Sequence, residues 1–218
     1  FGGHGMSGTG PKAGGSFYLQ KLTRIPEWVA PPLSRIGQAD EVALKRLEAL
    51  IHKLPFNAEE KSIVQTTLEK SAARNLCKAE ALLPGPTGER NSLHWHASKR
   101  IWIYGGNLLQ AVCALAVLCI AGVHVVVQQE SPLSAYVGDL KGLLEIADKP
   151  ENTGISRVVA LEPLPSAIKQ TLAQCDGALI RILPSEQGVD ILQVFEEISC
   201  SVNTTAAGGN ASLMAKAD

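Results

Sequence analysis

The residues in this sequence most able to do chemistry are the glycines of its first stretch, Phe1 to Gly15. So many glycines rule out a helix or strand interior and predict a loop whose backbone comes close to another group. Successive free N–H groups at Ala13, Gly14 and Gly15 would form a concave nest that binds a carboxylate. A phosphate cradle is disfavoured, because the glycine spacing fits neither the dinucleotide fingerprint nor the P-loop. A surface loop without a ligand is the alternative that spacing alone leaves open.

Four other groups are candidate site residues. His94 and His96 would share one side of an extended segment, as two metal ligands can, but no third ligand lies near them in sequence. Cys200 is a candidate nucleophile without a nearby His or acid, so we expect it to be structural. The turn at Gly105-Gly106 has only part of a dinucleotide fingerprint, and Glu130 could bind a ribose or be an ordinary exposed acid. We therefore predict no catalytic, cofactor-binding or metal-binding residues among these groups.

The elements that position these residues are organised around the most apolar stretch, residues 101–127. Ile101 to Tyr104 predicts a strand, Gly105-Gly106 a turn, and Asn107 to Ile120 a helix. Gly122 supplies the left-handed position that ends many helices, and the β-branched run Val123 to Val127 predicts a buried strand. The stretch is thus a βαβ unit with a right-handed crossover.

The rest of the chain extends this pattern. Two helices are expected upstream, one from Asp40 and one from Asn57 to Pro84, with Glu60 completing a capping box on Asn57. Strands that alternate with helices indicate a parallel sheet with helices on both faces. The remaining predictions are a helix at 131–147, a strand at 157–161, a helix at 165–174, a strand at 178–183 and a β-rich hairpin or flap at 189–202.

Composition describes an ordinary globular protein. With 45% hydrophobic residues and a net charge of −1, the chain has no basic surface for nucleic acid, so we expect no contact with DNA or RNA. Its five cysteines are odd in number and lack Cys-x-x-Cys spacing, which favours free thiols in a reducing compartment. Leu108 to Val127 carries no formal charge, but Gln110, His124 and Gly122 argue against a membrane span. Because the chain starts at Phe1 inside a motif, we expect it to be part of a longer protein.

Three motifs give the chain a family resemblance. They are the glycine-rich stretch Phe1–Gly15, the segment Leu83–Asn91 and the segment Ser201–Met214. In this order they resemble the C-terminal part of proteins of the proline utilization A family. These proteins are bifunctional enzymes, proline dehydrogenase and L-glutamate γ-semialdehyde dehydrogenase in one chain, and they belong to the aldehyde dehydrogenase superfamily. The resemblance spans the whole length, although residues 37–82 and 139–156 match weakly.

The resemblance implies an α/β fold with a Rossmann-like parallel sheet, a degenerate aldehyde dehydrogenase nucleotide-binding domain. By this resemblance residues 1–35 end the semialdehyde dehydrogenase catalytic domain, and 36–84 form a helical linker or hairpin. Residues 85–198 form the Rossmann-like non-catalytic domain, and 199–218 form a C-terminal tail. The anchoring of the aldehyde substrate's α-carboxylate by backbone N–H groups falls on Ala13, Gly14 and Gly15.

The implied function is the oxidation of proline to glutamate through pyrroline-5-carboxylate and glutamate semialdehyde. The full-length enzyme would use NAD and FAD, whereas this part alone would bind neither and would be inactive. It would supply the anchor loop, a lid over the tunnel between two active sites, and an interaction tail. The expected partners are the rest of the same polypeptide, further copies in a homo-oligomer and the small-molecule substrate, in the cytoplasm or at the periphery of the inner membrane. The alternative is an autonomous nucleotide-binding or oligomerisation module with a Rossmann-like fold.

Overall fold

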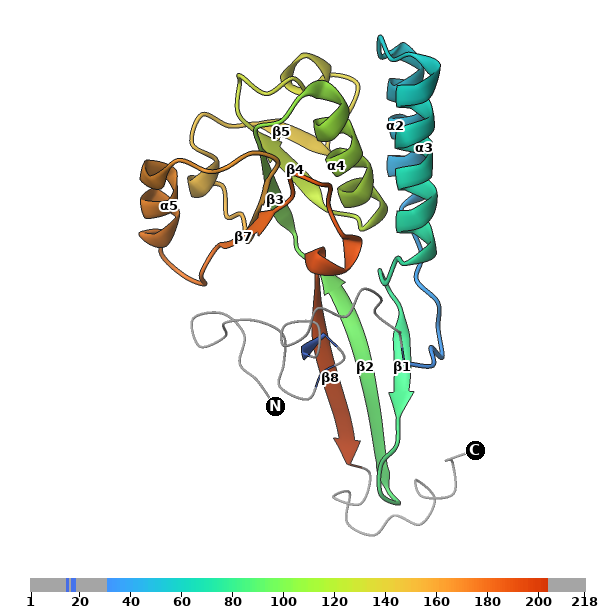
Figure 1. The fold of residues 1–218 in the computed structure, drawn as a ribbon. Coiled ribbons are helices and arrows are strands. Elements are labelled where there is room, and N and C mark those ends of the chain that lie inside the picture. Colours follow the sequence, from blue (N-terminus) through green and yellow to red (C-terminus); the bar gives the residue numbers. More distant parts are fainter. Residues whose placement is uncertain (1–14, 16, 19–30, 204–218) are drawn as a thin grey trace.

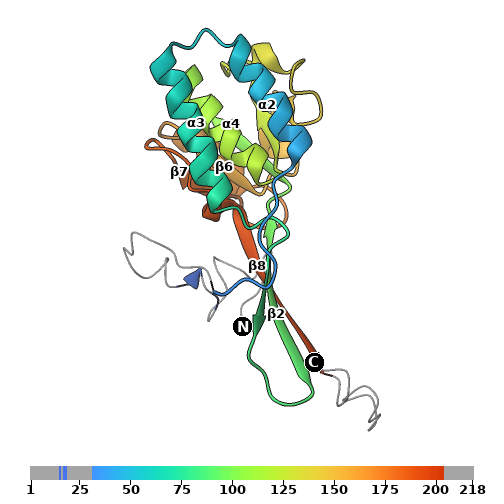
Figure 2. The ribbon, with the colours of Figure 1, turned by 90° about the vertical axis from the view of Figure 1, so that its right-hand side faces the viewer.

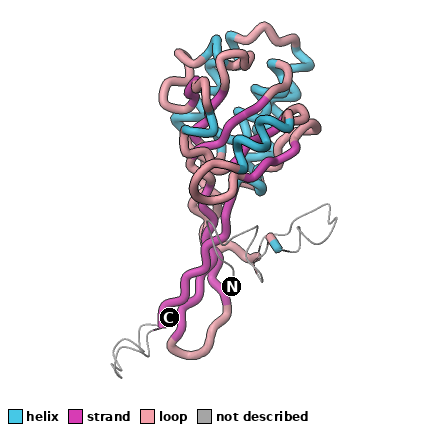
Figure 3. The backbone as a smooth tube through the Cα atoms, turned by 90° about the vertical axis from the view of Figure 1, so that its left-hand side faces the viewer, coloured by secondary structure: helices cyan, strands magenta, loops and turns pink. Residues whose placement is uncertain are grey.

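A computed structural model describes residues 15, 17, 18 and 31–203 of the chain. These residues form a compact α/β part from which a long, narrow antiparallel sheet extends (Figure 1, Figure 3). The compact part contains a five-stranded sheet in the order β5-β4-β3-β6-β7, in which all neighbours are parallel. The predicted α/β fold with a parallel sheet is therefore confirmed. The strands are β3 (Arg100–Tyr104), β4 (His124–Val127), β5 (Leu144–Ile146), β6 (Arg157–Ala160) and β7 (Arg181–Pro184).

The βαβ unit forms as its sequence predicts. Helix α4 (Leu108–Ile120) connects β3 to the parallel strand β4. Asn107 and Gln110 close a capping box at its start. At its end Gly122 adopts a φ of +73°, its N–H bonds the Cys119 carbonyl, and the Val123 N–H bonds the Leu118 carbonyl, which is a Schellman motif. Within the described residues, no helix is both long enough and apolar enough to cross a bilayer.

The two faces of the parallel sheet are covered by different helices (Figure 1). Ile101 and Ile103 of β3 belong to the core that also contains α4. Trp102 and Tyr104 point to the opposite face, where α5 (Ser166–Ala173) covers a second core. The two rings meet edge to face, with centroids 5.4 Å apart. This alternation along β3 is what a central strand buried on both faces requires.

A helical hairpin covers the side of α4 that faces away from the sheet (Figure 2). It consists of α2 (Glu41–Lys53) and α3 (Ala58–Ala73). Asn57 caps α3 and forms the predicted capping box with Glu60. The hairpin buries an apolar stripe against α4, made of Ala43, Leu47, Leu50, Val64 and Leu68. Helix α4 is thus enclosed between the sheet and the hairpin.

The second sheet is the flap, which we define as β1 (Glu80–Leu83), β2 (Glu89–Ala97) and β8 (Phe195–Asn203). Its order is β1-β2-β8 and both pairings are antiparallel. The expected β structure at residues 189–202 is confirmed for β8, which is a single strand of the flap and not a hairpin of its own. Ile191–Val194 is a 3₁₀ turn instead. The expectation that the second helix runs to Pro84 is wrong, because the helix ends at Ala73 and β1 follows it.

The helix expected over residues 131–147 is also wrong. This segment contains a 3₁₀ turn, Ser134–Tyr136, followed by the short strand β5. The Val125 N–H of β4 bonds the Leu143 carbonyl, and β5 extends the sheet beside β4. Gly142, at a φ of +85°, lies between the turn and the strand. Pairing with β4 therefore overrides the helical pattern of apolar residues, of which Leu133, Leu140 and Leu144 are still buried.

Substitution of Leu118 by Ala tests the enclosure of α4. Leu118 is fully buried, so its truncation should lower the free energy of unfolding by about 2–5 kcal/mol through lost burial and a cavity. Urea unfolding followed by circular dichroism measures this. The same change at Leu179, which is 61% exposed, is the matched control and should cost less than about 0.5 kcal/mol. Equal losses at the two positions would contradict the described packing.

Candidate functional site

The predicted carboxylate anchor lies mostly outside the described residues. Ala13 and Gly14 are not described, and Gly15 is half-buried. The Gly15 carbonyl accepts a hydrogen bond from the Tyr18 N–H at 3.1 Å. The Phe17 N–H donates to a carboxylate oxygen of Glu197 at 2.9 Å, which links this segment to β8. The anchoring role of Ala13, Gly14 and Gly15 therefore stays a prediction.

The Gly105-Gly106 turn lies at the position where doubly wound folds bind their ligands. From β3 the chain continues to β4 and β5 on one side of the sheet, and β6 leads to β7 on the other. The carboxyl ends of β3 and β6 therefore flank the point where the strand order reverses, which is the usual ligand crevice. Both glycines adopt left-handed conformations, with φ values of +68° and +81°. The turn leads directly into the N-terminus of α4.

A side chain of the same protein lies against this turn. Glu162 follows β6, and one of its carboxylate oxygens lies 3.5 Å from the Gly106 nitrogen. A Cβ atom at Gly105 would approach the Glu162 side chain to 2.2 Å, and one at Gly106 would lie 2.8 Å from Leu161. Gly106 is therefore needed for the packing of Leu161 onto the turn, and the positive φ values favour glycine at both positions. Sequence reasoning missed Glu162, because its only local signal is an acid placed directly after a predicted strand.

The other candidates for nucleotide contacts lie apart from the turn. The Asn107 N–H is bonded by Gln110 and the Gln110 N–H by Asn107, so these groups are occupied within the helix start. Glu130 is exposed in the turn after β4. These contacts are those of a capped helix, which leaves fewer free N–H groups for a phosphate.

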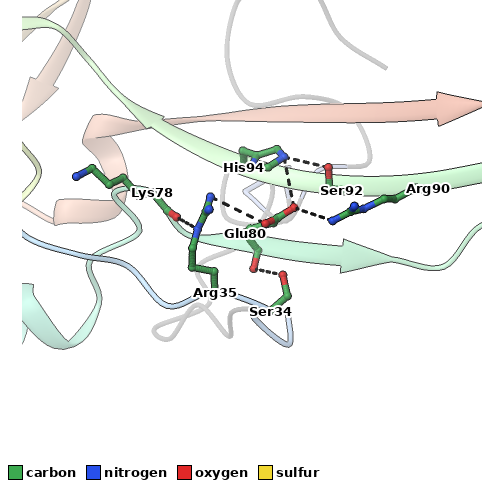
Figure 4. Close-up of polar contacts among 7 residues, drawn as sticks. All are labelled: Ser34, Arg35, Lys78, Glu80, Arg90, Ser92 and His94. Atoms are coloured by element: carbon green, nitrogen blue, oxygen red, sulfur yellow. Dashed lines mark hydrogen bonds and ion pairs between the residues drawn. The ribbon is translucent and has the colours of Figure 1, made fainter. Parts of the chain in front are cut away.

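A polar cluster on the flap brings together a serine, a histidine and an acid (Figure 4). The Ser92 hydroxyl lies 2.9 Å from His94 Nε2, and a Glu80 carboxylate oxygen lies 3.9 Å from the same nitrogen. In a catalytic triad the acid and the nucleophile contact different ring nitrogens, so that the imidazole can pass a proton between them. Here one nitrogen faces both groups. The cluster therefore lacks the geometry of a proton relay.

The same cluster joins the segment before α2 to the flap (Figure 4). Arg35 and Arg90 each place a guanidinium nitrogen 3.9 Å from the Glu80 carboxylate. Arg35 Nε also donates to the Lys78 carbonyl at 2.6 Å, and the Ser34 N–H donates to the Glu80 carbonyl at 2.8 Å. Both arginines are more than half exposed, so these ion pairs contribute little to stability. We interpret the cluster as a structural connection.

The two histidines of β2 lie on an extended strand, as expected. His94 is half-buried against Glu80 and Ser92, and His96 is exposed. Within residues 31–203 and the three described residues before them, no group of three His, Cys, Asp or Glu side chains could hold a metal ion.

The cysteines are free thiols, and three of them have environments unsuited to a nucleophile. Burial raises the pKa of Cys119 to about 12 and also raises the pKa values of Cys77 and Cys113. A nucleophilic cysteine requires the opposite direction, because the thiolate is the reactive form. Cys200 is exposed on β8, opposite Ser92 in the flap.

A pocket of about 540 Å³ lies between α3, the first turns of α4 and the loop after β7. Its lining includes Gln110 and Cys113 of α4 and the ion pair Arg74–Asp190, whose closest atoms are 3.2 Å apart. This ion pair connects α3 to the loop. The pocket is therefore a groove between the hairpin and the sheet part of the molecule.

Alkylation rates test the thiol environments. At about pH 8, iodoacetamide should modify exposed Cys200 in the folded chain while leaving Cys119 unmodified, because burial keeps Cys119 protonated and inaccessible. Peptide mass spectrometry measures both sites in one sample. In denaturant the two should react at similar rates, which is the internal control. Equal rates in the folded chain would contradict the burial of Cys119.

No protein-family model matches this chain. The bifunctional protein PutA of Rhizobium meliloti is 32% identical over 241 residues, which is 99% of this chain and 18% of the relative. PutA of Salmonella typhimurium is 29% identical over 241 residues, which is 98% of this chain and 17% of the relative. The chain thus spans less than a fifth of the length of these curated relatives.

A solved structure supports the same fold. Proline utilization A from Corynebacterium freiburgense aligns with 90% of this chain and 18% of its own length, with a TM-score of 0.52 and 16% sequence identity. At this identity the match concerns the fold alone. The sequence matches carry the family relationship, and they confirm the resemblance found from the motifs. Along nearly its whole length, the chain is related to one segment of the proline utilization A family.

Proposed function

We propose that the chain is the C-terminal part of a bifunctional enzyme that oxidises proline to glutamate through pyrroline-5-carboxylate and glutamate semialdehyde. The observation that carries this proposal is the 32% identity to a bifunctional PutA protein over 99% of the chain. The complete polypeptide would use FAD for proline oxidation and NAD for semialdehyde oxidation. It would act as a cytoplasmic homo-oligomer, with or without peripheral contact to the inner membrane.

The first role of this part is to anchor the substrate. The N–H groups of Ala13, Gly14 and Gly15 would donate to the α-carboxylate of glutamate semialdehyde. Backbone donors suit this task because they are fixed before the substrate arrives, so binding does not have to order them. The glycine spacing supports the role, since it fits neither of the two phosphate motifs.

The second role is that of a non-catalytic lid. The α/β part would cover the tunnel through which the intermediate passes between two active sites, without doing chemistry itself. Two observations support this role. Glu162 lies against the turn where a cofactor's phosphates would bind, and burial raises the pKa values of Cys77, Cys113 and Cys119, which makes these thiols poor nucleophiles.

The third role falls to the tail Ser201–Met214, which would dock on another part of the enzyme. Residues beyond Asn203 lie outside the described part.

The 218-residue chain alone should have no aldehyde dehydrogenase activity, because the nucleophilic thiol, the base and most of the cofactor site would lie elsewhere in the polypeptide. The assay follows NADH formation with glutamate semialdehyde. The matched control is Cys200→Ser, which removes the exposed thiol and should give the same background rate. Turnover that disappears in this variant would instead favour an autonomous enzyme.

In the complete enzyme, Gly14→Val should lower kcat/KM for glutamate semialdehyde about 100-fold or more. The side chain would crowd the carboxylate and displace about two charge-assisted hydrogen bonds, each worth about 1.5–3 kcal/mol. Steady-state kinetics measure this loss. The control is an aldehyde of similar length without the carboxylate, which should be much less affected. Equal losses with the two substrates would mean that the loop is misfolded and would count against the anchoring role.

A further inference from the structure

The Gly105-Gly106 turn combines the features that attract a phosphate. It follows the first strand of a doubly wound sheet, lies at the point where the strand order reverses, and precedes the 13-residue helix α4. The N-terminus of a helix carries a partial positive charge, which the capping box of α4 does not remove although it occupies the Asn107 and Gln110 N–H groups. Anions therefore bind readily at such positions.

The anion at this turn is supplied by the protein itself. The Glu162 carboxylate lies 3.5 Å from the Gly106 nitrogen. A Cβ atom at Gly105 would lie 2.2 Å from Glu162 Cγ, 2.3 Å from Cδ and 2.7 Å from Oε1. Three atoms of the glutamate side chain thus fill the space that the missing side chain of Gly105 leaves. In a dinucleotide site, glycine provides the same close approach for a pyrophosphate.

A phosphate at this position would meet two obstacles. The Glu162 side chain takes up space against Gly105, and its negative charge would repel the phosphate at short range. Glu162 is exposed, so its carboxylate can leave the turn. A phosphate that takes its place binds more weakly, because the contact between Glu162 and the Gly106 N–H is lost.

From this geometry we propose that Glu162 is an internal substitute for a phosphate and excludes phosphate-containing ligands from the carboxyl edge of the sheet. The inference rests on the proposed function, in which the α/β part is a lid without a cofactor. It adds the residue responsible for that property. Gly105 then leaves the space that the Glu162 side chain occupies, whereas Gly106 is needed for its close contact with Leu161.

The test is calorimetric titration of the 218-residue chain with inorganic pyrophosphate at constant ionic strength. Removal of the carboxylate in Glu162→Ala should tighten binding about tenfold or more relative to the wild type. The matched control is Glu130→Ala, which removes an exposed acid after β4 and changes the net charge equally. It should bind pyrophosphate as weakly as the wild type does.

A second variant covers the case in which Glu162→Ala does not fold, as judged by its thermal melt. Glu162→Gln keeps the size of the side chain and removes its charge, so it should bind pyrophosphate about threefold or more tightly than the wild type. If the folded variants bind no more tightly than the wild type or than Glu130→Ala, the inference is wrong while the lid remains possible. If the wild-type chain itself binds NAD with a Kd below about 100 μM, the lid without a cofactor is wrong.

Discussion

Helix α4 imposes the constraint on which the rest of the molecule depends. Nine of its thirteen residues are buried, and every residue from Ala114 to Ile120 is among them, so these last two turns have no face that can be left in water. A helix that is apolar all round must be covered on every side. The parallel sheet covers one side and the α2–α3 hairpin covers the other. Residues 41–73 therefore contribute to the core of the α/β part, whereas the family resemblance implied a helical linker or hairpin here. Each Leu or Val buried in this way contributes about 1.5–3 kcal/mol.

Elements whose formation depends on local sequence were predicted well. The capping residues Asn57 and Asn107 and the helix-ending Gly122 act within a few residues of their own positions, and each was identified correctly. The strands β1, β2 and β5 were not predicted, because their residues adopt a strand through pairing with other segments: β1 with β2, β2 with β8, and β5 with β4. Such pairing depends on distant segments, and it outweighs the weak helical preference of a short Leu- and Ala-containing run.

The candidate site also depends on contacts between distant segments, which the sequence alone does not predict. The sequence indicated that the Gly105-Gly106 turn lacks a complete nucleotide fingerprint, but it could not indicate what lies against the turn. Glu162 is 57 residues further along the chain than Gly105 and reaches it only because β6 pairs with β3. The glycines alone are consistent with a phosphate or with a close contact inside the protein. Strand order, which the sequence does not encode locally, decides between them. The anchor residues Ala13 and Gly14 remain predictions, since they lie outside the described residues.

The pairing of β2 with β8 has a consequence for how the chain folds. Ala97 lies opposite Phe195 and Glu89 opposite Asn203, so the two strands are about a hundred residues apart in sequence. All five strands of the parallel sheet are contained in the segment between them. Bringing such distant strands together costs less chain entropy once that segment is already compact. During synthesis on the ribosome, the β1–β2 hairpin would emerge early and keep an open edge until the last strand arrives. Closure of the flap is thus the step that marks the completion of the domain.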